Sequence, residues 1–133
     1  MDRLSYTGAM NGLILFGHGA RDPRWADPFE RVRALVVAGR PDLQVRLAFL
    51  EFMPPNLAAA AESLVAAGCR GVRIVPVFLG QGGHVRADVP PMVAALAARH
   101  PDVTFDLRPA IGEDDAVLAA IAAVCTRDLA GPK

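Results

Sequence analysis

Hydrophobic residues gather into four short runs, and longer Ala-rich segments separate these runs. The first and third runs are apolar almost throughout, which is typical of strands that helices cover on both faces. The second run alternates more, with Arg46 between Val45 and Leu47, and this favours a place nearer the edge of a sheet. Strand and helix signals that alternate along the chain predict crossover units and a parallel sheet. The runs are GLILFG (residues 12–17), QVRLAFLEF (44–52), GVRIVPVFLG (71–80) and VTFDLRPAIG (103–112).

The segment after the first run contains two possible helix starts. Asp22 is followed by Pro23, and Asp27 is followed by Pro28. Either aspartate can cap free backbone amides, and proline suits the first helical position, so both starts stay open. The helix is expected to end at Gly39, and its predicted core face consists of Phe29, Val32, Leu35 and Val36.

Three further helices have clear end signals. One is expected from Asn56 to Gly68, and the next contains PPMVAALAARH. Pro90 and Pro91 are expected in the first turn of that helix, because an interior proline breaks a helix, and His100 at its end is expected on the surface. The last helix begins near the acidic residues 113–115, which favour the N-terminal end of a helix dipole. The predicted core face of the helix that starts at Asn56 consists of Leu57, Ala60, Leu64 and Val65.

These elements predict an α/β fold with three layers, α/β/α, around a mainly parallel sheet of four or five strands. The chain has 133 residues, of which 53% are hydrophobic. This is enough for one good core and too little for two domains of ordinary size. We expect residues 1–12 to form an N-terminal tail and residues 13–130 to form a single domain.

Charge and hydropathy exclude several classes of partner. The 14 basic residues balance the 14 acidic ones, so the sequence predicts no general attraction to nucleic acid or to an anionic membrane. It contains no signal peptide and no run of about 18 apolar residues, which predicts a soluble, cytoplasmic protein. Cys69 and Cys125 lie far apart in apolar surroundings and are expected to be reduced, packed thiols.

Polar residues follow three of the predicted strands at the point where each strand ends. His18 follows the first strand, Glu51 the second and His84 the third, and successive members are 33 positions apart. Groups at the carboxyl ends of parallel strands meet at one edge of the sheet, so these three converge if the first strand lies between the other two. Glycines flank or precede both histidines and allow sharp turns there.

Two imidazoles and one carboxylate form a ligand set suited to a divalent transition metal, with coordination positions left open. Any one of these residues alone is most often an ordinary loop residue, and their combination is what indicates a metal site. Nearby arginines, otherwise ordinary solvated residues, are placed to meet an anionic ligand. The predicted substrate-binding residues are Arg21, Gln81, Gly82, Gly83, Arg86 and Arg108, and Trp25, Phe52 and Met53 form either an apolar wall or part of the packing.

Several of these stretches resemble the small sirohydrochlorin chelatases of the CbiX type. The stretches are GHGARDPR, AFLE followed by Pro54, VPVFLGQGGHVRADVP and RPAIG, and the similarity runs from about Leu13 to Leu129. VPVFLGQGGHVRADVP is the most specific of them. Many relatives have His-Gly-Ser where this chain has His18-Gly19-Ala20, so a hydroxyl near the site is missing but no metal ligand is lost.

The resemblance implies a chelatase-like fold and an ATP-independent lyase that inserts Co²⁺ or Fe²⁺ into sirohydrochlorin, for cobalamin or sirohaem synthesis. It assigns catalysis and metal binding to His18, Glu51 and His84. The metal is then a substrate and no permanent cofactor is expected. A single-domain chain of this length also resembles the family members that pair as homodimers.

Two other functions remain open at this point. One is a metal carrier that uses the same three ligands without catalysis. The other is a histidine phosphotransferase of the phosphoglycerate mutase type, although that family has Arg immediately before its histidine and Gly17 stands there in this chain. The sequence also leaves the choice among cobalt, iron and nickel open, since a His/Glu set accepts all three.

Overall fold

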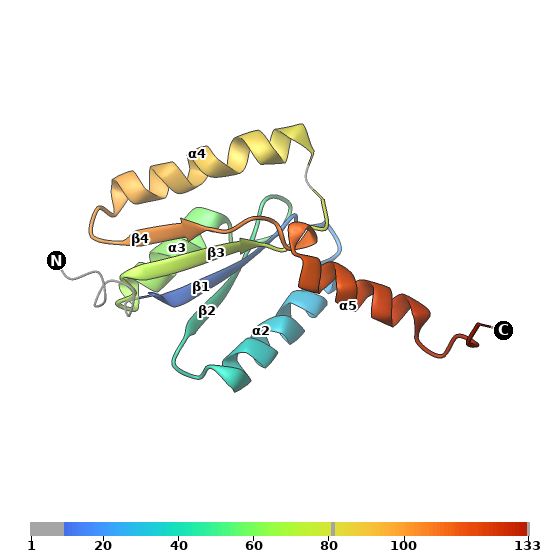
Figure 1. Ribbon diagram of the computed structural model, residues 1–133. Coiled ribbons are helices and arrows are strands. Elements are labelled where there is room, and N and C mark those ends of the chain that lie inside the picture. Colours follow the sequence, from blue (N-terminus) through green and yellow to red (C-terminus); the bar gives the residue numbers. More distant parts are fainter. Residues whose placement is uncertain (1–9, 81, 133) are drawn as a thin grey trace.

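The four hydrophobic runs form the four strands of one parallel sheet. The computed structural model describes residues 10–80 and 82–132, without the side chain of His84. The strands stand in the order β2-β1-β3-β4, and every neighbouring pair is parallel. The predicted edge position of the second strand is therefore confirmed, and the first strand lies between the second and third, as convergence of the three polar groups requires (Figure 1). In chain order the elements are β1 (Met10–Gly17), η1 (Pro23–Ala26), α2 (Asp27–Gly39), β2 (Gln44–Phe49), α3 (Leu57–Ala66), β3 (Gly71–Pro76), α4 (Gly83–Arg99), β4 (Thr104–Leu107), η2 (Ile111–Glu113) and α5 (Asp115–Thr126).

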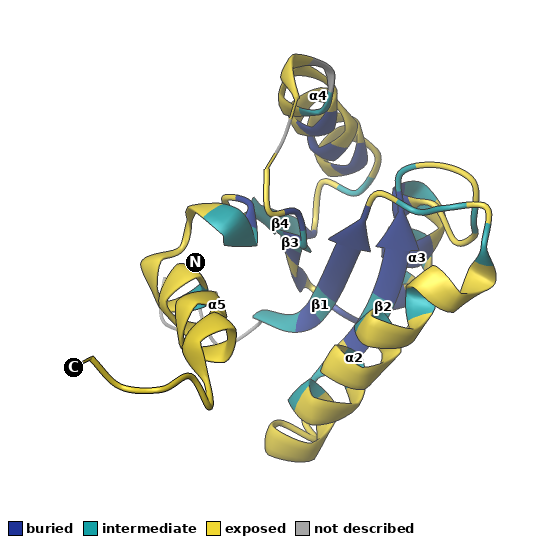
Figure 2. Ribbon diagram, turned by 90° about the vertical axis from the view of Figure 1, so that its right-hand side faces the viewer, coloured by how far each residue is buried: buried dark blue, intermediate teal, exposed yellow. Residues whose placement is uncertain are grey.

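Alternating side chains divide the sheet into two faces, of which α3 and α4 cover one, while α2 covers the other over β1 and β2. Along β1, Ile14 and Phe16 point to the face under α3 and α4, while Leu15 points to the face under α2. Most residues of β1 and β2 are buried on both faces, as the near-continuous apolar run of β1 predicts, whereas none of β4 is buried (Figure 2). The fold is thus the predicted three-layer α/β arrangement with four strands, and β1 begins three residues before Leu13.

Both predicted starts of the first helix are used, one after the other. Asp22 caps the short helix η1 by accepting a hydrogen bond from the backbone N–H of Arg24, and α2 follows from Asp27. The predicted core face of α2 is only half right. Phe29 and Val36 pack on the sheet, but Val32 and Leu35 are 41% and 73% exposed. The half-buried positions 26, 29, 33 and 36 mark the face that meets the sheet. Val32 lies at the flank of this face, and Leu35 is rotated away from it.

The prediction that Pro90 and Pro91 lie in the first turn of their helix is wrong. Helix α4 begins at Gly83, so both prolines lie in its interior. A proline there removes the N–H that would bond the carbonyl four residues earlier, which here belongs to Arg86 or Ala87. All four residues are exposed, so water can replace the missing donors. The helix stays on the sheet because it buries Val89, Val93 and Leu96.

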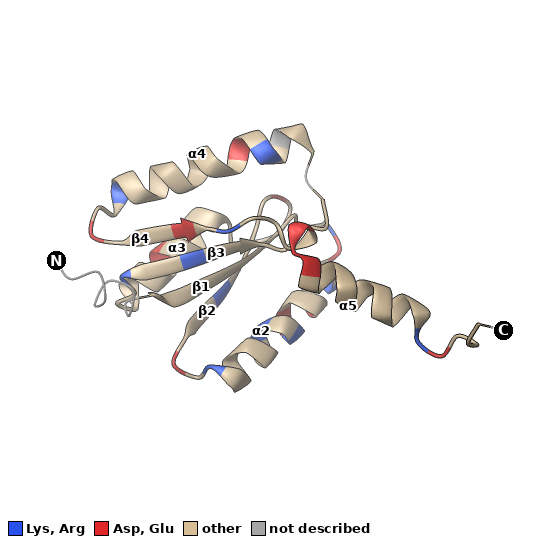
Figure 3. Cartoon of the chain, in the orientation of Figure 1, with Lys and Arg blue, Asp and Glu red and all other residues tan. Residues whose placement is uncertain are grey.

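Helix α5 leaves the rest of the fold at η2, and none of its residues is buried. From Ala116 to Cys125 it carries no charge (Figure 3), yet Leu118, Ile121 and Val124 are 46%, 39% and 57% exposed. A helix that is apolar on all sides is normally buried.

Two side chains depart from their expected surroundings. Cys69 is packed as expected, and burial raises the pKa of its thiol, but Cys125 on α5 is exposed. His100 is not a free surface residue, because its Nε2 lies 2.9 Å from Oε1 of Glu62 on α3 and the ring is only 17% exposed.

None of the helices in the described part of the chain has the length and apolar character needed to cross a membrane.

The core on the α3–α4 side is expected to dominate stability. Leu64 of α3 is fully buried, while Leu35 of α2 is 73% exposed. Leu64→Ala leaves a cavity and should lower the free energy of unfolding by about 2–5 kcal/mol, measured by urea denaturation. The same truncation at Leu35 should cost less than about 0.5 kcal/mol, and equal losses at the two positions would contradict this account of the layers.

Candidate functional site

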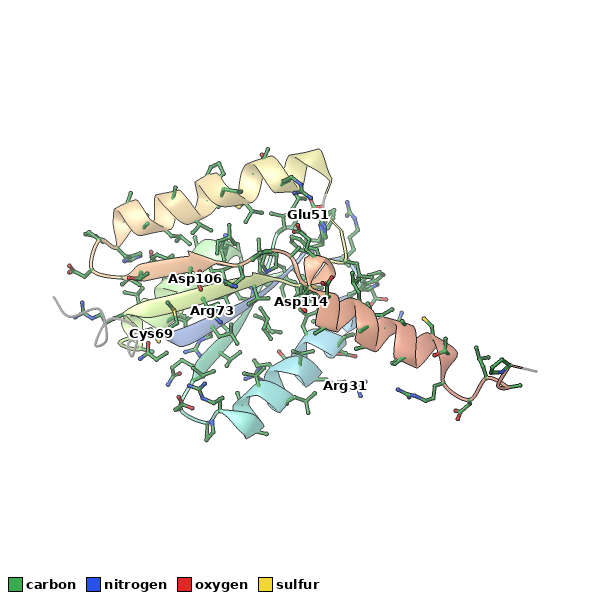
Figure 4. The ribbon with its side chains drawn as sticks, viewed as in Figure 1. Arg31, Glu51, Cys69, Arg73, Asp106 and Asp114 are labelled. Carbon is green, nitrogen blue, oxygen red and sulfur yellow. The ribbon has the colours of Figure 1, made fainter. Side chains whose placement is uncertain are left out.

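The loops after β1 and β2 continue the hydrogen-bond ladder beyond the strands themselves. The backbone N–H of Leu50 donates to the carbonyl of Gly17 at 2.9 Å, and that of Glu51 donates to the carbonyl of His18 at 3.0 Å. His18 and Glu51 therefore stand beside each other at the carboxyl edge of the sheet, although they are 33 positions apart in sequence. Both are exposed, so their side chains are open to solvent. Figure 4 labels Glu51.

Gly19 allows the two loops to approach this closely. Its φ is 88°, in the left-handed region, and a Cβ built on it would collide with the carbonyl oxygen of Glu51. Only glycine satisfies both requirements without strain. The glycine after His18 is thus needed for the turn, as the sequence predicts. Gly17 has a different role, because a Cβ there would meet the ring of Phe29 on α2.

The ring of His18 lies on that of Phe78. The two ring centroids are 4.4 Å apart and the planes are tilted by 40°. Phe78 is 3% exposed, and its carbonyl accepts a hydrogen bond from Gly112 at 2.9 Å, which fixes it just beyond β3. This platform limits the orientations of the imidazole while leaving it reachable. Phe78 was not among the predicted site residues, because in the sequence it reads as one more apolar residue of the third run.

The loop from β3 to α4 contributes the third predicted group. Gly82 precedes α4 in an extended conformation and its carbonyl accepts the N–H of Arg86 at 3.1 Å, while His84 is in the first turn of α4. Gln81 and the side chain of His84 lie outside the described residues. Among the side chains that are described, no three His, Cys, Asp or Glu lie close enough to hold a metal ion, so the His18–Glu51–His84 ligand set stays a prediction.

The predicted arginines divide between different places. The guanidinium of Arg21 lies 4.8 Å from the ring centroid of Phe52, one residue past Glu51. Arg86 is exposed in the first turn of α4. Arg108 instead follows β4 on the far side of β3, where its Nη1 lies 3.9 Å from Oδ1 of Asp106. The structure thus brings Arg21 to Phe52, the neighbour of Glu51 in sequence, and Arg108 faces a different part of the surface.

Asp22 is occupied by a neighbour. Nη2 of Arg24 donates to Oδ2 of Asp22 at 2.6 Å, and this contact lowers the pKa of the Asp22 carboxyl below its ordinary value. The carboxylate next to Arg21 in sequence is therefore already paired. The three residues considered for an apolar wall differ in exposure. Met53 packs on the core under α2, whereas Trp25 and Phe52 are 67% and 57% exposed.

Together these groups give one edge of the sheet an exposed imidazole, a carboxylate and a guanidinium. An imidazole can bind a transition metal or accept a proton near neutral pH, and a carboxylate can balance the charge of a cation. The guanidinium can hold a carboxylate of a ligand. Such an edge suits the binding of a metal ion and an anionic ligand next to each other at a solvent-exposed site.

A family model described as CbiX matches residues 12–127. Among curated proteins, the sirohydrochlorin cobaltochelatase of Priestia megaterium is 29% identical over 96 residues, which cover 72% of this chain and 31% of that protein. The sirohydrochlorin cobaltochelatase of Saccharolobus islandicus is 32% identical over 81 residues, covering 61% of this chain and 62% of that protein. The chain spans less than two thirds of the length of the curated relatives it matches.

Solved structures give the same picture of the fold. A crystal structure from Marinobacter aquaeolei VT8, described as a CbiX protein of cobalamin (vitamin B12) biosynthesis, is 32% identical. It superposes with a TM-score of 0.77, and the match covers 89% of this chain and 96% of that one. SirB from Bacillus subtilis with Fe³⁺ is 24% identical with a TM-score of 0.75, covering 91% of this chain and 48% of SirB. That second likeness concerns the fold alone.

The close approach at Gly19 predicts a sharp effect of one added methyl group. Gly19→Ala combines a positive φ with a collision against the Glu51 carbonyl, and it should lower the free energy of unfolding by about 1–3 kcal/mol. Gly39→Ala at the end of α2 is the control, since a Cβ there meets nothing within 4 Å. That variant should stay within about 0.5 kcal/mol of wild type in the same denaturant titration, and a Gly19→Ala protein as stable as the control would refute the argument.

Proposed function

The chain belongs to the CbiX family, and we propose that it is an ATP-independent lyase that inserts a divalent metal ion, Co²⁺ or Fe²⁺, into sirohydrochlorin. The product would serve cobalamin or sirohaem synthesis. Family membership and the names of the curated relatives support the substrate class. The observation that carries the proposal is the pairing of His18 with Glu51 at the carboxyl edge of the sheet, where the backbone N–H of one donates to the carbonyl of the other at 3.0 Å.

The proposed reaction exchanges two protons for one metal ion. Two pyrrole N–H bonds break, the metal binds the macrocycle nitrogens, and the two protons pass to bases of the protein and then to water. His18 and His84 bind the incoming ion, and each imidazole nitrogen that the ion leaves on passing to the macrocycle accepts one of these protons, because a neutral imidazole can do either in turn. Glu51 balances the charge of the cation and relays protons. Holding the macrocycle over the ion, with part of its hydration removed, supplies most of the acceleration.

Sirohydrochlorin carries many carboxylates, and arginine is the side chain best suited to bind them in pairs of hydrogen bonds. In the proposal Arg21 and Arg86, with Gln81, Gly82 and Gly83 of the loop before α4, bind these groups around the metal. Arg108 is a weaker candidate, because it follows β4 on the far side of β3 and its Nη1 lies 3.9 Å from Oδ1 of Asp106. The ligand set accepts Co²⁺, Fe²⁺ and Ni²⁺, so metal supply would decide among them.

The first test is insertion itself. Protein, sirohydrochlorin and Co²⁺ are mixed without oxygen or ATP, and the visible spectrum is followed against a protein-free control. We expect turnover by wild type and a loss of about 10²- to 10⁴-fold in His18→Ala. His100→Gln, at the opposite end of α4 from the site, should retain wild-type turnover. Tight metal binding without turnover by wild type would mean a carrier, and wild-type rates in His18→Ala would refute the assignment.

We also propose that the chain acts as a homodimer in which α5 lies against the second copy. The support is the exposed apolar surface of this helix, which is uncharged from Ala116 to Cys125. Acidic residues at its N-terminal end, Asp114 and Asp115, disfavour an anionic lipid surface as the occupant. Equal numbers of acidic and basic residues mean that two copies do not repel each other.

Sedimentation measures this directly. Wild type should sediment as a dimer at micromolar concentration, and Ile121→Glu should sediment as a monomer, because a charge on an apolar interface is left without a partner. Leu35→Glu, on the exposed side of α2, is the matched control and should stay dimeric. A monomeric wild type, or a dimeric Ile121→Glu protein, would rule out this interface.

A further inference from the structure

Glu51, Phe52 and Met53 form a tight turn that holds an aromatic side chain in an unusual backbone conformation. The N–H of Met53 donates to the carbonyl of Glu51 at 2.9 Å, which closes a three-residue turn around Phe52. Phe52 has a φ of 70°, in the left-handed region, and its side chain is 57% exposed. Turns of this kind are rare and strained when the central residue is bulky.

The turn is held on both sides, so Phe52 is not the tip of a loose loop. On one side, the carbonyl of Glu51 lies directly against Gly19. On the other, the N–H of Phe49 donates to the carbonyl of Pro55 at 2.8 Å and closes the loop, while Met53 packs on the core under α2. Backbone strain of this kind persists only where the surroundings enforce it, and it gathers at functional sites.

The exposed ring of Phe52 contacts a cation, the guanidinium of Arg21, which is attracted to the negative face of the ring. The guanidinium carbon of Arg21 lies 4.8 Å from the ring centroid of Phe52, within the range of a cation–π contact. Arg21 comes from the loop after β1 and Phe52 from the loop after β2, so the contact joins the loop of His18 to the loop of Glu51. A guanidinium stacked on a ring keeps its N–H groups at the rim of its plane, where a carboxylate can accept two of them.

We infer that Phe52 is a positioning residue, which holds the guanidinium of Arg21 ready for a carboxylate at the rim of the substrate. This rests on the proposed function, and it adds a specificity determinant to it. A free arginine side chain has many rotamers, and fixing one of them before binding reduces the entropy lost when the ligand arrives. The strained turn that begins at Glu51 thus orients a ligand-binding group.

Steady-state kinetics with sirohydrochlorin and Co²⁺ test the inference. Phe52→Leu removes the ring and should raise KM for sirohydrochlorin about 2- to 5-fold, with kcat and the KM for Co²⁺ unchanged. Phe52→Tyr keeps the ring and should behave as wild type. Phe52→Gly also removes the ring but suits a positive φ, so it guards against a fold defect. Unchanged KM in both ringless variants would overturn the inference, whereas no turnover by wild type would overturn the proposed function instead.

A double-mutant cycle separates positioning from direct contact with the substrate. Arg21→Ala should raise KM about 10-fold or more, as expected for a lost charged hydrogen bond. If Phe52 acts through Arg21, then Phe52→Leu has no further effect once Arg21 is alanine. Equal effects of Phe52→Leu in the two backgrounds would show that the ring meets the substrate itself, and the positioning role would be wrong.

Discussion

The contact between Gly19 and the carbonyl of Glu51 is the constraint on which the geometry of the site depends. A parallel ladder normally ends where its strands end, yet here it continues into both loops through Leu50 and Glu51. That continuation requires the loops to come closer than any side chain on residue 19 would allow. His18 and Glu51 are therefore fixed by backbone hydrogen bonds and need no hydrogen bond between their side chains to stay together. Their polar atoms remain available for a ligand.

Aromatic residues around the edge also fix polar side chains without forming hydrogen bonds to them. Phe78 is buried and supports the ring of His18 from below, while Phe52 is exposed and supports Arg21 from the neighbouring loop. In both cases an apolar ring restricts a polar side chain without using up its hydrogen-bonding groups. Elsewhere on the sheet, charged groups pair with each other, as Arg73 on β3 does with Asp106 on β4 at 3.0 Å (Figure 4). The charged groups of Arg73 and Asp106 are thus occupied by each other, whereas the polar groups of His18 and Arg21 that rest on rings are available for a ligand.

Much of the fold could be predicted from local pattern, and the failures have physical causes. Continuous apolar runs mark buried parallel strands, and capping residues such as Asn56 mark helix starts, because both signals are local. The predicted start of α4 is wrong because Pro90 and Pro91 lie on an exposed side of the helix. Water can there bond the carbonyls that the prolines leave without an N–H donor. At the site, the topology accounts for His18 and Glu51, since strand ends must meet in a parallel sheet. The positions of Phe78 and of the strained turn at Phe52 depend on tertiary contacts that no local pattern encodes.

An open edge with few ligands suits the transfer of a metal better than its storage. A site that encloses an ion with four protein ligands binds it tightly and releases it slowly. Here both described ligand candidates are exposed, and each is fixed through its backbone or a supporting ring, so an ion can arrive and leave without rearranging the core. Under the proposed function, rigidity serves the tetrapyrrole substrate, because a flat, carboxylate-bearing ring needs its binding groups in fixed positions to lie over a small ion. Under the proposed function, the strained turn at Phe52 meets that demand, because it holds the guanidinium of Arg21 beside the proposed metal ligands at a cost in local stability.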